Sequence, residues 1–534
     1  MHRFAFVVSA VALCGQTTPP AATGSISGVV QYENGKAPEA GIVRISPGGY
    51  EIKLDDKGHY SQHDLKPGTY HISAETNRGW GPSGSRLVAL GTGQDMTADL
   101  RLRPNAGITG RVLDENKEPV AGASVFLIAR EYQLGELRYV RAFVEQTNDQ
   151  GEYMVAEVPP DRGYLLLAKK TVHEVPPISD SPVDVKLRKR ILIPTYYPGV
   201  DSVEGAEVVT LSSGERREGM DIRMYRSASY CIEAVLAGAH GPVSLMFFLE
   251  EKQPTDGEAF GRGMYMVPTQ GTAGADGRIR VCDQHPGDYR LAAFDLNQKY
   301  FGAAPVTITD GDALKVRVNA VQRVPVPGEV VWDGKAPEKP IDPTISISLA
   351  PAIGRTIMNW PDLQAKSSVP GEFSFDGLFA GDYPVKVRGL PDNLYVKDIT
   401  YGGRSVLHKP LSVGSAIGKA TLRIVVSPDG GRMEGRTADK NGNPTPDCFI
   451  AVIAASADTE AEMSSMVDFE ITDQNGAWST HRLAPGKYYV VASQHRFDLS
   501  PEGAARLWHS RMSAHEVDLG PGATEQVTVE PMAE

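Results

Sequence analysis

Short stretches in which apolar and polar residues alternate recur along the chain. Three of them sit on either side of a glycine turn, at 87–102, 208–224 and 515–531 (LVALGTGQDMTADLRL, VVTLSSGERREGMDIRM and HEVDLGPGATEQVTVEP). A period of two places alternate side chains on opposite faces, which is typical of half-buried β-strands. The pattern therefore predicts a protein built from short strands.

A longer unit recurs five times and consists of a turn rich in Asp, Asn and Gly, a strand, a corner ending in Tyr, and a second strand. The copies are DDKGHYSQHDLKPGTYHISA, NDQGEYMVAEVPPDRGYLLLA, ADGRIRVCDQHPGDYRLAA, PGEFSFDGLFAGDYPVKV and DQNGAWSTHRLAPGKYYVVA. The turn Gly precedes the corner Tyr by 12 residues in four copies and by 13 in the second. Such regular spacing indicates a repeated domain.

The corner tyrosines lie 94, 125, 94 and 105 residues apart, a period that fits one β-sandwich domain. Gly after Asp or Asn suits a tight hairpin, and a corner Tyr can bury its ring while its hydroxyl bonds the backbone. We therefore predict a structural role for the corner tyrosines. They are Tyr70, Tyr164, Tyr289, Tyr383 and Tyr488.

The repeat predicts an all-β fold: a string of antiparallel β-sandwich domains of the transthyretin-like or immunoglobulin-like kind, with about seven strands each and almost no helix. The third domain lacks a clear opening motif and is expected to be the least typical. The predicted domains are 24–103, 104–225, 226–323, 324–428 and 429–534.

Three copies also begin alike, with a strand, a polar loop, Pro, small residues and another strand: ISGVVQYENGKAPEAGIVRIS, ITGRVLDENKEPVAGASVFLI and MEGRTADKNGNPTPDCFIAVI. Together with the Asp-x-Gly-x-Tyr turn and the Pro-Gly-x-Tyr corner, this pattern resembles the carboxypeptidase regulatory-like domain, a transthyretin-like sandwich grouped with carbohydrate-binding-like folds. Residues 110–168 and 435–492 match best, and 28–74 match closely. The resemblance implies a fold rather than a chemistry, since in carboxypeptidases this domain is the non-catalytic part. Tandem arrays of this kind look like those in exported proteins of Gram-negative soil bacteria, including Acidobacteria.

Composition agrees with a globular protein. Of 534 residues 41% are hydrophobic and 22% charged, and the 55 Gly and 38 Pro suit a chain with many turns. The net charge is −12 and no Lys/Arg stripe is interleaved with aromatic residues, so we expect no nucleic-acid partner.

The N-terminus predicts export. Residues 1–15 carry His2 and Arg3, then an apolar run to Leu13, which is typical of a secretory signal peptide. Lipidation of Cys14 is the alternative, but Leu13 stands where that signal normally has a small residue. After signal removal no stretch is long enough to span a membrane, so a periplasmic, outer-membrane-associated or extracellular location is expected.

Export also permits disulfides. Cys231 and Cys282 fall on predicted strands of one domain and are proposed to pair, whereas Cys448 lies in an apolar strand and is expected to be a buried free thiol.

Catalytic and metal-binding patterns do not emerge. There is no HExxH, GxSxG, P-loop or CxxC motif. His59, His63 and His71 were the sharpest metal candidates, but His71 leaves the other two if the Pro-Gly corner switches sheets. We therefore predict no metal site, no cofactor and no enzymatic activity.

Aromatic residues in loops give the remaining functional signal, since sugars stack on exposed aromatic faces. The candidates for carbohydrate binding are Trp80, Trp360, Tyr196 and Tyr197, and the alternative is that these rings plug the ends of the sandwiches. Trp478 takes the aromatic position of the motif and is assigned to the core.

These observations favour an exported, non-catalytic binding or scaffold protein of the cell envelope, whose partner is a glycan or an envelope protein. The alternatives are a purely structural spacer and an accessory subunit of an envelope enzyme or transport system.

Overall fold

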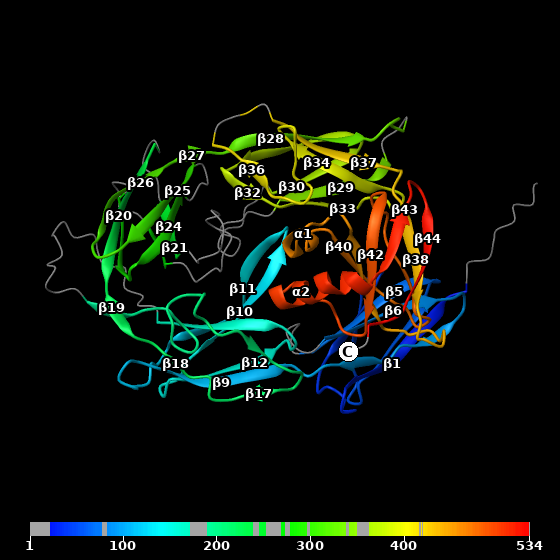
Figure 1. The fold of residues 1–534 in the computed structure, drawn as a ribbon, viewed down its shortest axis with the longest axis horizontal. Helices are drawn as coiled ribbons and strands as arrows, with labels where there is room; N and C mark the ends of the chain where they lie inside the picture. Colours follow the sequence, from blue (N-terminus) through cyan, green and yellow to red (C-terminus); the bar gives the residue numbers. More distant parts are fainter. Residues whose placement is uncertain are drawn as a thin grey trace, which may run out of the picture. The chain divides into compact units, whose positions relative to one another are not determined.

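The structure is a computed structural model and describes residues 22–76, 83–170, 189–238, 245–251, 269–272, 278–295, 300–337, 341–349, 363–415, 418 and 420–532. The chain divides into two compact units, Met1–Leu102 and Arg103–Glu534, which are described separately. Nearly all of the regular secondary structure in the described residues is β-strand, as the alternation predicts (Figure 1).

The first unit holds one β-sandwich, which we name sandwich 1. Its two sheets have the strand orders β4-β1-β7, with β8 also on β1, and β3-β2-β5-β6. The strands are β1 (Gly24–Tyr32), β2 (Ile42–Ser46), β3 (Tyr50–Lys53), β4 (His59–Leu65), β5 (Gly68–Glu75), β6 (Ser83–Leu90), β7 (Asp95–Thr97) and β8 (Leu100–Leu102).

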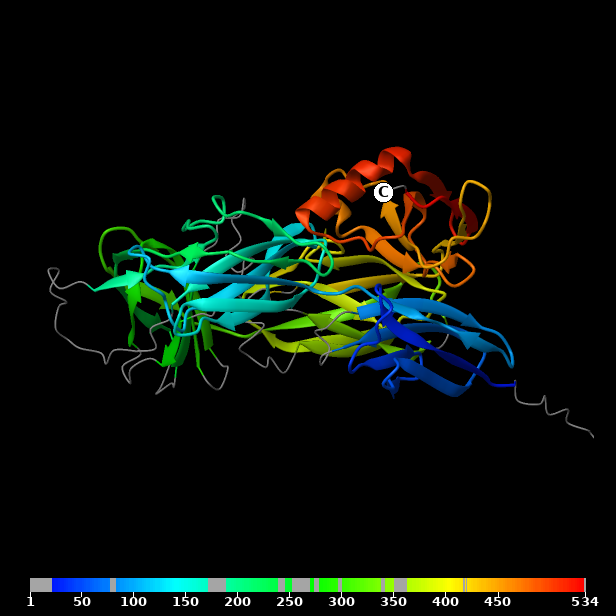
Figure 2. The ribbon, with the colours of Figure 1, turned by 90° about the horizontal axis from the view of Figure 1, so that it is seen from below.

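The second unit holds four further sets of paired sheets, sandwiches 2 to 5 (Figure 2). Sandwich 2 has β9 (Ala106–Leu113), β10 (Ser124–Gln133), β11 (Glu136–Gln146), β12 (Glu152–Val158), β13 (Gly163–Lys169), β14 (Arg190–Leu192), β15 (Thr195–Tyr196), β16 (Val209–Thr210), β17 (Arg216–Arg217) and β18 (Ile222–Arg223). Strand β19 (Arg226–Ala228) pairs with β14 and leads into sandwich 3. Sandwich 3 has β20 (Tyr230–Ala237), β21 (Leu245–Glu251), β22 (Thr269–Thr272), β23 (Arg278–Gln284), β24 (Gly287–Asp295), β25 (Tyr300–Ile308), β26 (Ala313–Asn319) and β27 (Val321–Gln322).

Sandwich 4 has β28 (Val324–Trp332), β29 (Ile341–Leu349), β30 (Gln364–Val369), β31 (Gly371–Leu378), β32 (Gly381–Tyr383), β33 (Val385–Arg388), β34 (Tyr395–Tyr401), β35 (Arg404–Ser405), β36 (Leu411–Val413) and β37 (Leu422–Ser427). Sandwich 5 has β38 (Arg432–Thr437), β39 (Phe449–Ala454), α1 (Glu460–Met463), β40 (Val467–Ile471), β41 (Ala477–Ser479), β42 (Gly486–Ser493), α2 (Pro501–Ser510), the 3-10 turn η3 (Arg511–Ser513), β43 (His515–Leu519) and β44 (Thr524–Val529).

All five sandwiches share one topology. The opening strand lies between an antiparallel neighbour, which follows the turn motif, and a parallel neighbour, which comes at or near the end of the sandwich. The parallel pair is an addition to the antiparallel pairing that the alternation predicts. The opening strands with their antiparallel and parallel partners are β1 with β4 and β7/β8, β9 with β12 and β17/β18, β20 with β23 and β26, β28 with β31 and β37, and β38 with β41 and β44.

The Pro-Gly corner switches sheets. In sandwich 1 the corner joins β4, beside β1, to β5, which pairs with β2 and β6 in the other sheet. Side chains from both sheets then share one core, which in sandwich 1 includes Ile26, Val43 and Leu65.

Two sandwiches also cover the outer face of one sheet. In sandwich 2, Phe126, Ile128, Leu165 and Leu167 lie on the side of β10 and β13 away from the main core and form a second buried cluster with Tyr196. In sandwich 5, the second cluster includes Ala451, Ile453 and Val491 of the sheet with Met463 of α1, and Ala504 and Leu507 of α2. Sheets buried on both faces explain why β10 and β13 read as continuous apolar runs.

Candidate functional site

Each corner tyrosine is buried and donates its hydroxyl proton to a backbone carbonyl just before the corner. The acceptor lies four residues earlier in four copies and five residues earlier in the second, the copy whose spacing is one residue longer. In each copy the hydroxyl therefore ties the tyrosine to the backbone just before the corner. The bonds are Tyr70 to Lys66 (2.8 Å), Tyr164 to Pro159 (2.9 Å), Tyr289 to His285 (2.7 Å), Tyr383 to Phe379 (2.9 Å) and Tyr488 to Ala484 (2.6 Å).

Burial also removes water from these phenols. It raises the pKa of Tyr488 to about 12, and it raises the pKa of Tyr164 and Tyr383 as well. The rings therefore stay neutral at physiological pH and act as hydrogen-bond donors rather than as proton acceptors.

A second repeated pair was missed by the sequence analysis. A glycine in the opening strand lies directly opposite the aromatic residue that follows the turn. A Cβ atom on Gly328 or Gly435 would meet the opposite ring, and one on Gly28 or Gly110 would first meet a backbone carbonyl of the parallel neighbour. At Gly435 such an atom would lie 2.5 Å from the Trp478 ring. The four pairs are Gly28 with Tyr60, Gly110 with Tyr153, Gly328 with Phe373 and Gly435 with Trp478.

Sandwich 3 has neither the glycine nor the aromatic residue of this pair. Ala234 stands where the others have Gly, and it faces Ile279 where the others have an aromatic ring. An aliphatic side chain leaves room for the Cβ of Ala234, so the two changes compensate.

The proposed carbohydrate-binding residues do not form a site in the described residues. Trp80 and Trp360 lie outside them. Tyr196 is 3% exposed inside the second cluster of sandwich 2, and Tyr197 packs partly buried against the main core. Tyr196 helps to cover the apolar outer face of β10 and β13, so its ring is not presented to a sugar.

Two cysteines form a disulfide in sandwich 3. Cys231 on β20 and Cys282 on β23 are joined by a disulfide across neighbouring strands, with Cα atoms 4.0 Å apart. Cys448 is a buried free thiol whose pKa is raised by burial. A buried thiol of this kind is unreactive.

The three histidines of sandwich 1 are separated. His59 contacts Asp55 (Nδ1 to Oδ2, 2.9 Å) and His63 contacts Ser61 (3.0 Å), while His71 lies on β5 in the other sheet. Within the part of the chain that the structure describes, no group of three or more His, Cys, Asp or Glu side chains is placed to hold a metal ion.

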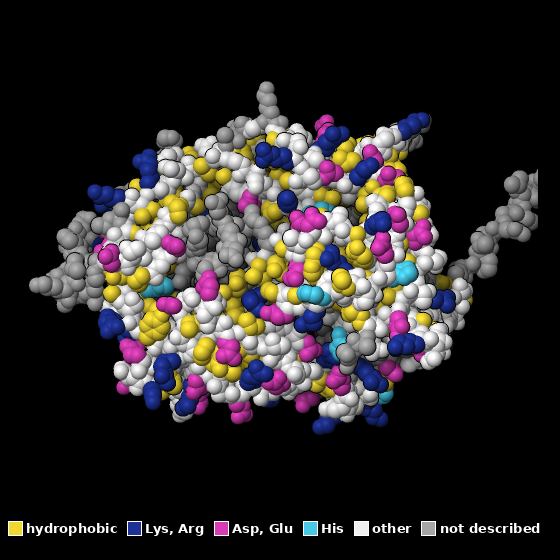
Figure 3. Space-filling view, viewed as in Figure 1, with side chains coloured by type: hydrophobic (Ala, Val, Ile, Leu, Met, Phe, Trp, Pro, Cys, Tyr) yellow, Lys and Arg dark blue, Asp and Glu magenta, His cyan; other side chains and the backbone are white. Residues whose placement is uncertain are grey.

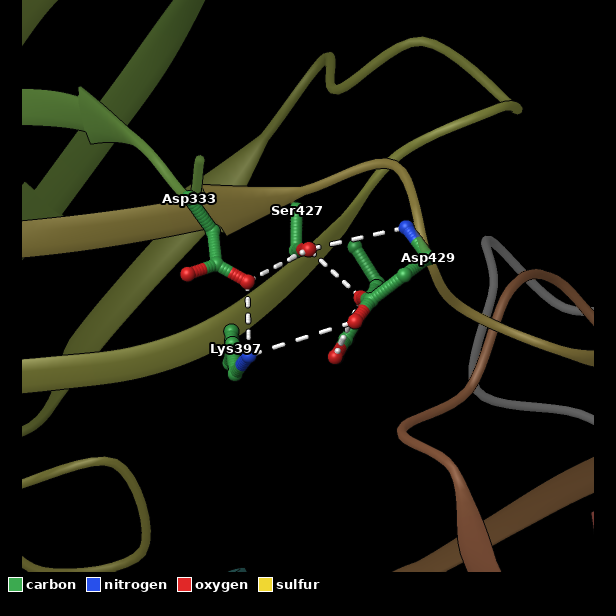
Figure 4. Close-up of polar contacts among 5 residues, drawn as sticks. Asp333, Lys397, Ser427 and Asp429 are labelled. Carbon is green, nitrogen blue, oxygen red and sulfur yellow. Dashed lines mark hydrogen bonds and ion pairs between the residues drawn. The ribbon is translucent and has the colours of Figure 1, made fainter. Parts of the chain in front are cut away.

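A polar cluster at the end of sandwich 4 gathers charged groups around a buried hydroxyl (Figure 4). Lys397 Nζ lies 2.6 Å from Asp333 Oδ2 and 3.9 Å from Asp429 Oδ2. Ser427, which is 1% exposed, donates to Asp429 at 2.5 Å or to Asp333 at 3.0 Å. The Tyr395 hydroxyl donates to Asp429 at 3.1 Å.

This cluster favours an ion pair over nucleophilic chemistry. The hydrogen bond from Lys397 lowers the pKa of Asp333, and the same bond raises the pKa of Lys397. A charged ammonium has no lone pair with which to take the Ser427 proton or to attack a carboxyl carbon. Because Asp429 follows β37 and precedes the first strand of sandwich 5, the cluster fastens the junction between sandwiches 4 and 5.

An open groove of about 650 Å³ lies on sandwich 2. Its lining includes Arg111, Glu152, Met154, Glu218 and Asp221, and Met154 is 64% exposed. Carboxylates outnumber the single Arg, which pairs with Asp221 at 3.5 Å. The groove therefore suits a cation better than an anion.

The face shown in Figure 3 gathers no single sign of charge. On the face shown in Figure 3, Lys and Arg side chains alternate with Asp and Glu side chains. Within the described ranges no helix is long and apolar enough to cross a membrane.

Comparison with known proteins identifies no family. No family model matches the chain, and no curated protein matches it. Several solved structures overlap with it at low similarity. The Bacillus anthracis TIE protein is 10% identical over 96% of this chain and 69% of its own, with a TM-score of 0.14. A streptococcal ancillary pilin is 14% identical over 55% and 98%, with a TM-score of 0.18.

The full-length RrgB pilus protein of Streptococcus pneumoniae is 8% identical over 81% of this chain and 99% of its own, with a TM-score of 0.15. These structures are not carboxypeptidase regulatory-like domains, and what they share with this chain is the multi-domain β-sandwich class. At such TM-scores they carry no argument about function.

Proposed function

We propose that this chain is an exported, non-catalytic scaffold or interaction protein of the cell envelope. The observation that carries the proposal is the use of the repeated residues. The corner tyrosines donate to backbone carbonyls, and four of the five turn motifs place their aromatic ring over a glycine. The repeated residues therefore stabilise the fold of each sandwich and form no binding site themselves. Any binding residues would lie outside the repeated motif.

The junctions between sandwiches support the scaffold reading. Arg226, beyond the last strand of sandwich 2, contacts Asp114 at 2.9 Å and Glu115 at 3.1 Å. At the next junction Phe301 of sandwich 3 and Phe379 of sandwich 4 have ring centroids 5.2 Å apart. The first contact ties the link after sandwich 2 back to that sandwich, and the second joins sandwiches 3 and 4 by side chains as well as by the chain.

The proposal also includes a family, a cellular location and a ligand class. Membership of the carboxypeptidase regulatory-like family rests on the quoted motifs, and export rests on residues 1–15, which lie outside the described residues. Carbohydrate binding rests on Trp80 and Trp360, since Tyr196 and Tyr197 are packed inward. A spacer role and an accessory role in an envelope enzyme or transport system are the alternatives.

Fractionation and cross-linking in intact cells test the proposal. The processed chain should appear in the envelope and cross-link reproducibly to one envelope protein. Recovery of the unprocessed chain in the cytoplasm would contradict export, and a processed chain with no cross-linked partner would favour the spacer.

A glycan array with the chain from residue 16 onward separates carbohydrate binding from protein binding. Trp80→Ala should abolish any glycan signal if Trp80 is a binding residue, and its thermal unfolding should match the unsubstituted chain within about 0.5 kcal/mol. Loss of stability in that variant would make Trp80 a core plug and remove the carbohydrate assignment.

A further inference from the structure

Sandwich 2 carries a β-hairpin that extends past its own sheet. Strand β10 pairs with β13 only from Ser124 to Ala129, but it continues to pair with β11 from Arg130↔Tyr139 to Gln133↔Glu136. We call residues 130–139 the overhang. A two-stranded hairpin alone is marginally stable in water, so an ordered overhang needs a surface to pack against.

Sandwich 5 carries two insertions on one face. The segment between β39 and β40 contains α1, and the segment between β42 and β43 contains α2 and η3. In sandwich 2, by contrast, β10 and β11 are joined by a two-residue turn. We call residues 455–466 and 494–514 the cap, because their apolar side chains cover the outer face of the sheet.

The overhang and the cap touch through backbone and apolar contacts. The Tyr132 amide donates to the Leu499 carbonyl at 2.7 Å. The Tyr132 side chain packs against the buried cluster that α2 forms with the sheet of sandwich 5. At the hairpin turn, a Cβ atom on Gly135 would lie 3.5 Å from the Ala461 carbonyl oxygen, so the two backbones approach closely.

A charged pair completes the contact. Arg130 forms an ion pair with Glu502 in the first turn of α2, where a carboxylate also faces the positive end of the helix. The Arg130 side chain is only 16% exposed, whereas Lys487 in an ordinary surface pair of sandwich 5 is 60% exposed. Partial burial strengthens such a pair relative to a fully solvated one.

We propose that the cap is a docking surface for the overhang, and that the two form an intramolecular clasp between sandwiches 2 and 5. The clasp joins residues 372 positions apart in the chain, so it fixes two sandwiches that the sequence order separates. The occupant of the cap is thus a named segment of the same chain, which the apolar Tyr132 and the cationic Arg130 fit by shape and charge.

Hydrogen exchange on the full chain tests the clasp through charge reversal. Arg130→Glu and Glu502→Arg should each speed amide exchange in the cap and the overhang about fivefold or more, since local opening becomes easier. The exchanged double variant, with both substitutions, should restore protection. Lys487→Glu combined with Glu516→Lys reverses a pair at 2.9 Å outside the clasp and should leave cap exchange unchanged.

Two readouts keep the proposal falsifiable. Exchange in β12 of sandwich 2 and β38 of sandwich 5 reports whether a variant unfolds its sandwich, and Glu502→Arg on an exposed first turn is the milder change. Unchanged cap exchange in both single variants, with both sandwiches folded, would overturn the clasp.

Zero-length cross-linking distinguishes one chain from two. In Arg130→Lys the new amine should couple to the Glu502 carboxylate after carbodiimide activation, and the cross-linked peptide should come from the monomer band. A cross-link found only in a dimer band would overturn the intramolecular clasp.

Discussion

At the scale of single residues, the role of the corner tyrosine can be predicted from the sequence, whereas the role of the opening-strand glycine cannot. The corner tyrosine bonds a carbonyl four or five residues away, so a local spacing is enough to predict its role. The glycine opposite the aromatic ring depends on strand register between positions more than thirty residues apart, which local pattern does not give. The signal that could have found it is the joint exchange to Ala234 and Ile279 in sandwich 3.

Gly435→Ala tests the glycine and aromatic pair. The added methyl would lie 2.5 Å from both the Trp478 ring and the Val527 carbonyl oxygen, so we expect a loss of roughly 1 to 3 kcal/mol from overpacking. Gly520→Ala in the same sandwich is the matched control, since its nearest neighbour is the Ala523 methyl at 3.6 Å. Urea unfolding monitored by Trp fluorescence measures both, and equal midpoints for the two variants would contradict the pair.

Two substitutions of Tyr488 separate its ring from its hydroxyl. Tyr488→Phe keeps the packing and leaves the Ala484 carbonyl without its donor, which costs about 0.5 to 1.5 kcal/mol. Tyr488→Ala also removes a buried ring and should cost about 3 to 5 kcal/mol. Urea unfolding of the two variants should show this ranking, and a phenylalanine variant as damaged as the alanine variant would mean that the hydrogen bond dominates.

At the scale of elements, the sequence analysis did not predict the two helical insertions of sandwich 5. The expected near-absence of helix is confirmed in the described residues, and the longest helix, α2, has an ordinary start. Ser500 caps it by accepting from the Gly503 amide at 3.0 Å, and Pro501 follows at the first helical position. That start signal is visible in the sequence. The burial of Tyr196 was also foreseeable from the continuous apolar runs of β10 and β13, which indicate strands covered on both faces.

Strand β40, at the edge of its sheet, adds a pH-dependent element. Asp468 and Glu470 pair with Val452 and Ile450, so their carboxylates lie on the core-facing side of the strand. Burial, followed by the neighbouring Asp468 charge, raises the pKa of Glu470 to about 7. Burial also raises the pKa of Asp468, which faces His481 at 3.9 Å and the nearby His408.

The sign of the resulting pH dependence follows from proton binding. A carboxyl whose pKa is higher in the folded chain than in the unfolded chain binds more protons when folded, so stability falls as pH rises from about 4.5 to about 7. Glu470→Gln should flatten that fall and make sandwich 5 more stable than the unsubstituted chain at pH 8. Urea unfolding at pH 5, 6, 7 and 8 measures it with Glu525→Gln as the control, and an unchanged slope would contradict the assignment.

At the scale of the whole molecule, the repeat period predicts the number of sandwiches, because each copy of the motif brings its own core. Sequence order does not predict which sandwiches touch. The contact of Arg130 with Glu502 depends on an overhang and on a helix in an insertion, and neither belongs to the repeated pattern. The repeated motif therefore predicts the fold of each sandwich, whereas the insertions determine which sandwiches contact each other.

Limited proteolysis should cut the junctions between sandwiches at different rates, because side-chain contacts hold some of them and not others. We predict cleavage near residues 104, 226, 324 and 429, releasing fragments of roughly 100 residues. The division into compact units falls between Leu102 and Arg103, so the cut near 104 should come first.

Side chains hold two of the other junctions: Arg226 holds the one at 226, and the Lys397 cluster holds the one at 429. These two cuts should therefore come later. Arg226→Ala should speed the cut near 226, and Lys397→Ala should speed the cut near 429. Mass spectrometry of a time course gives the order of the cuts. Simultaneous cleavage at all four positions would mean that the side-chain contacts at the junctions do not restrain the chain.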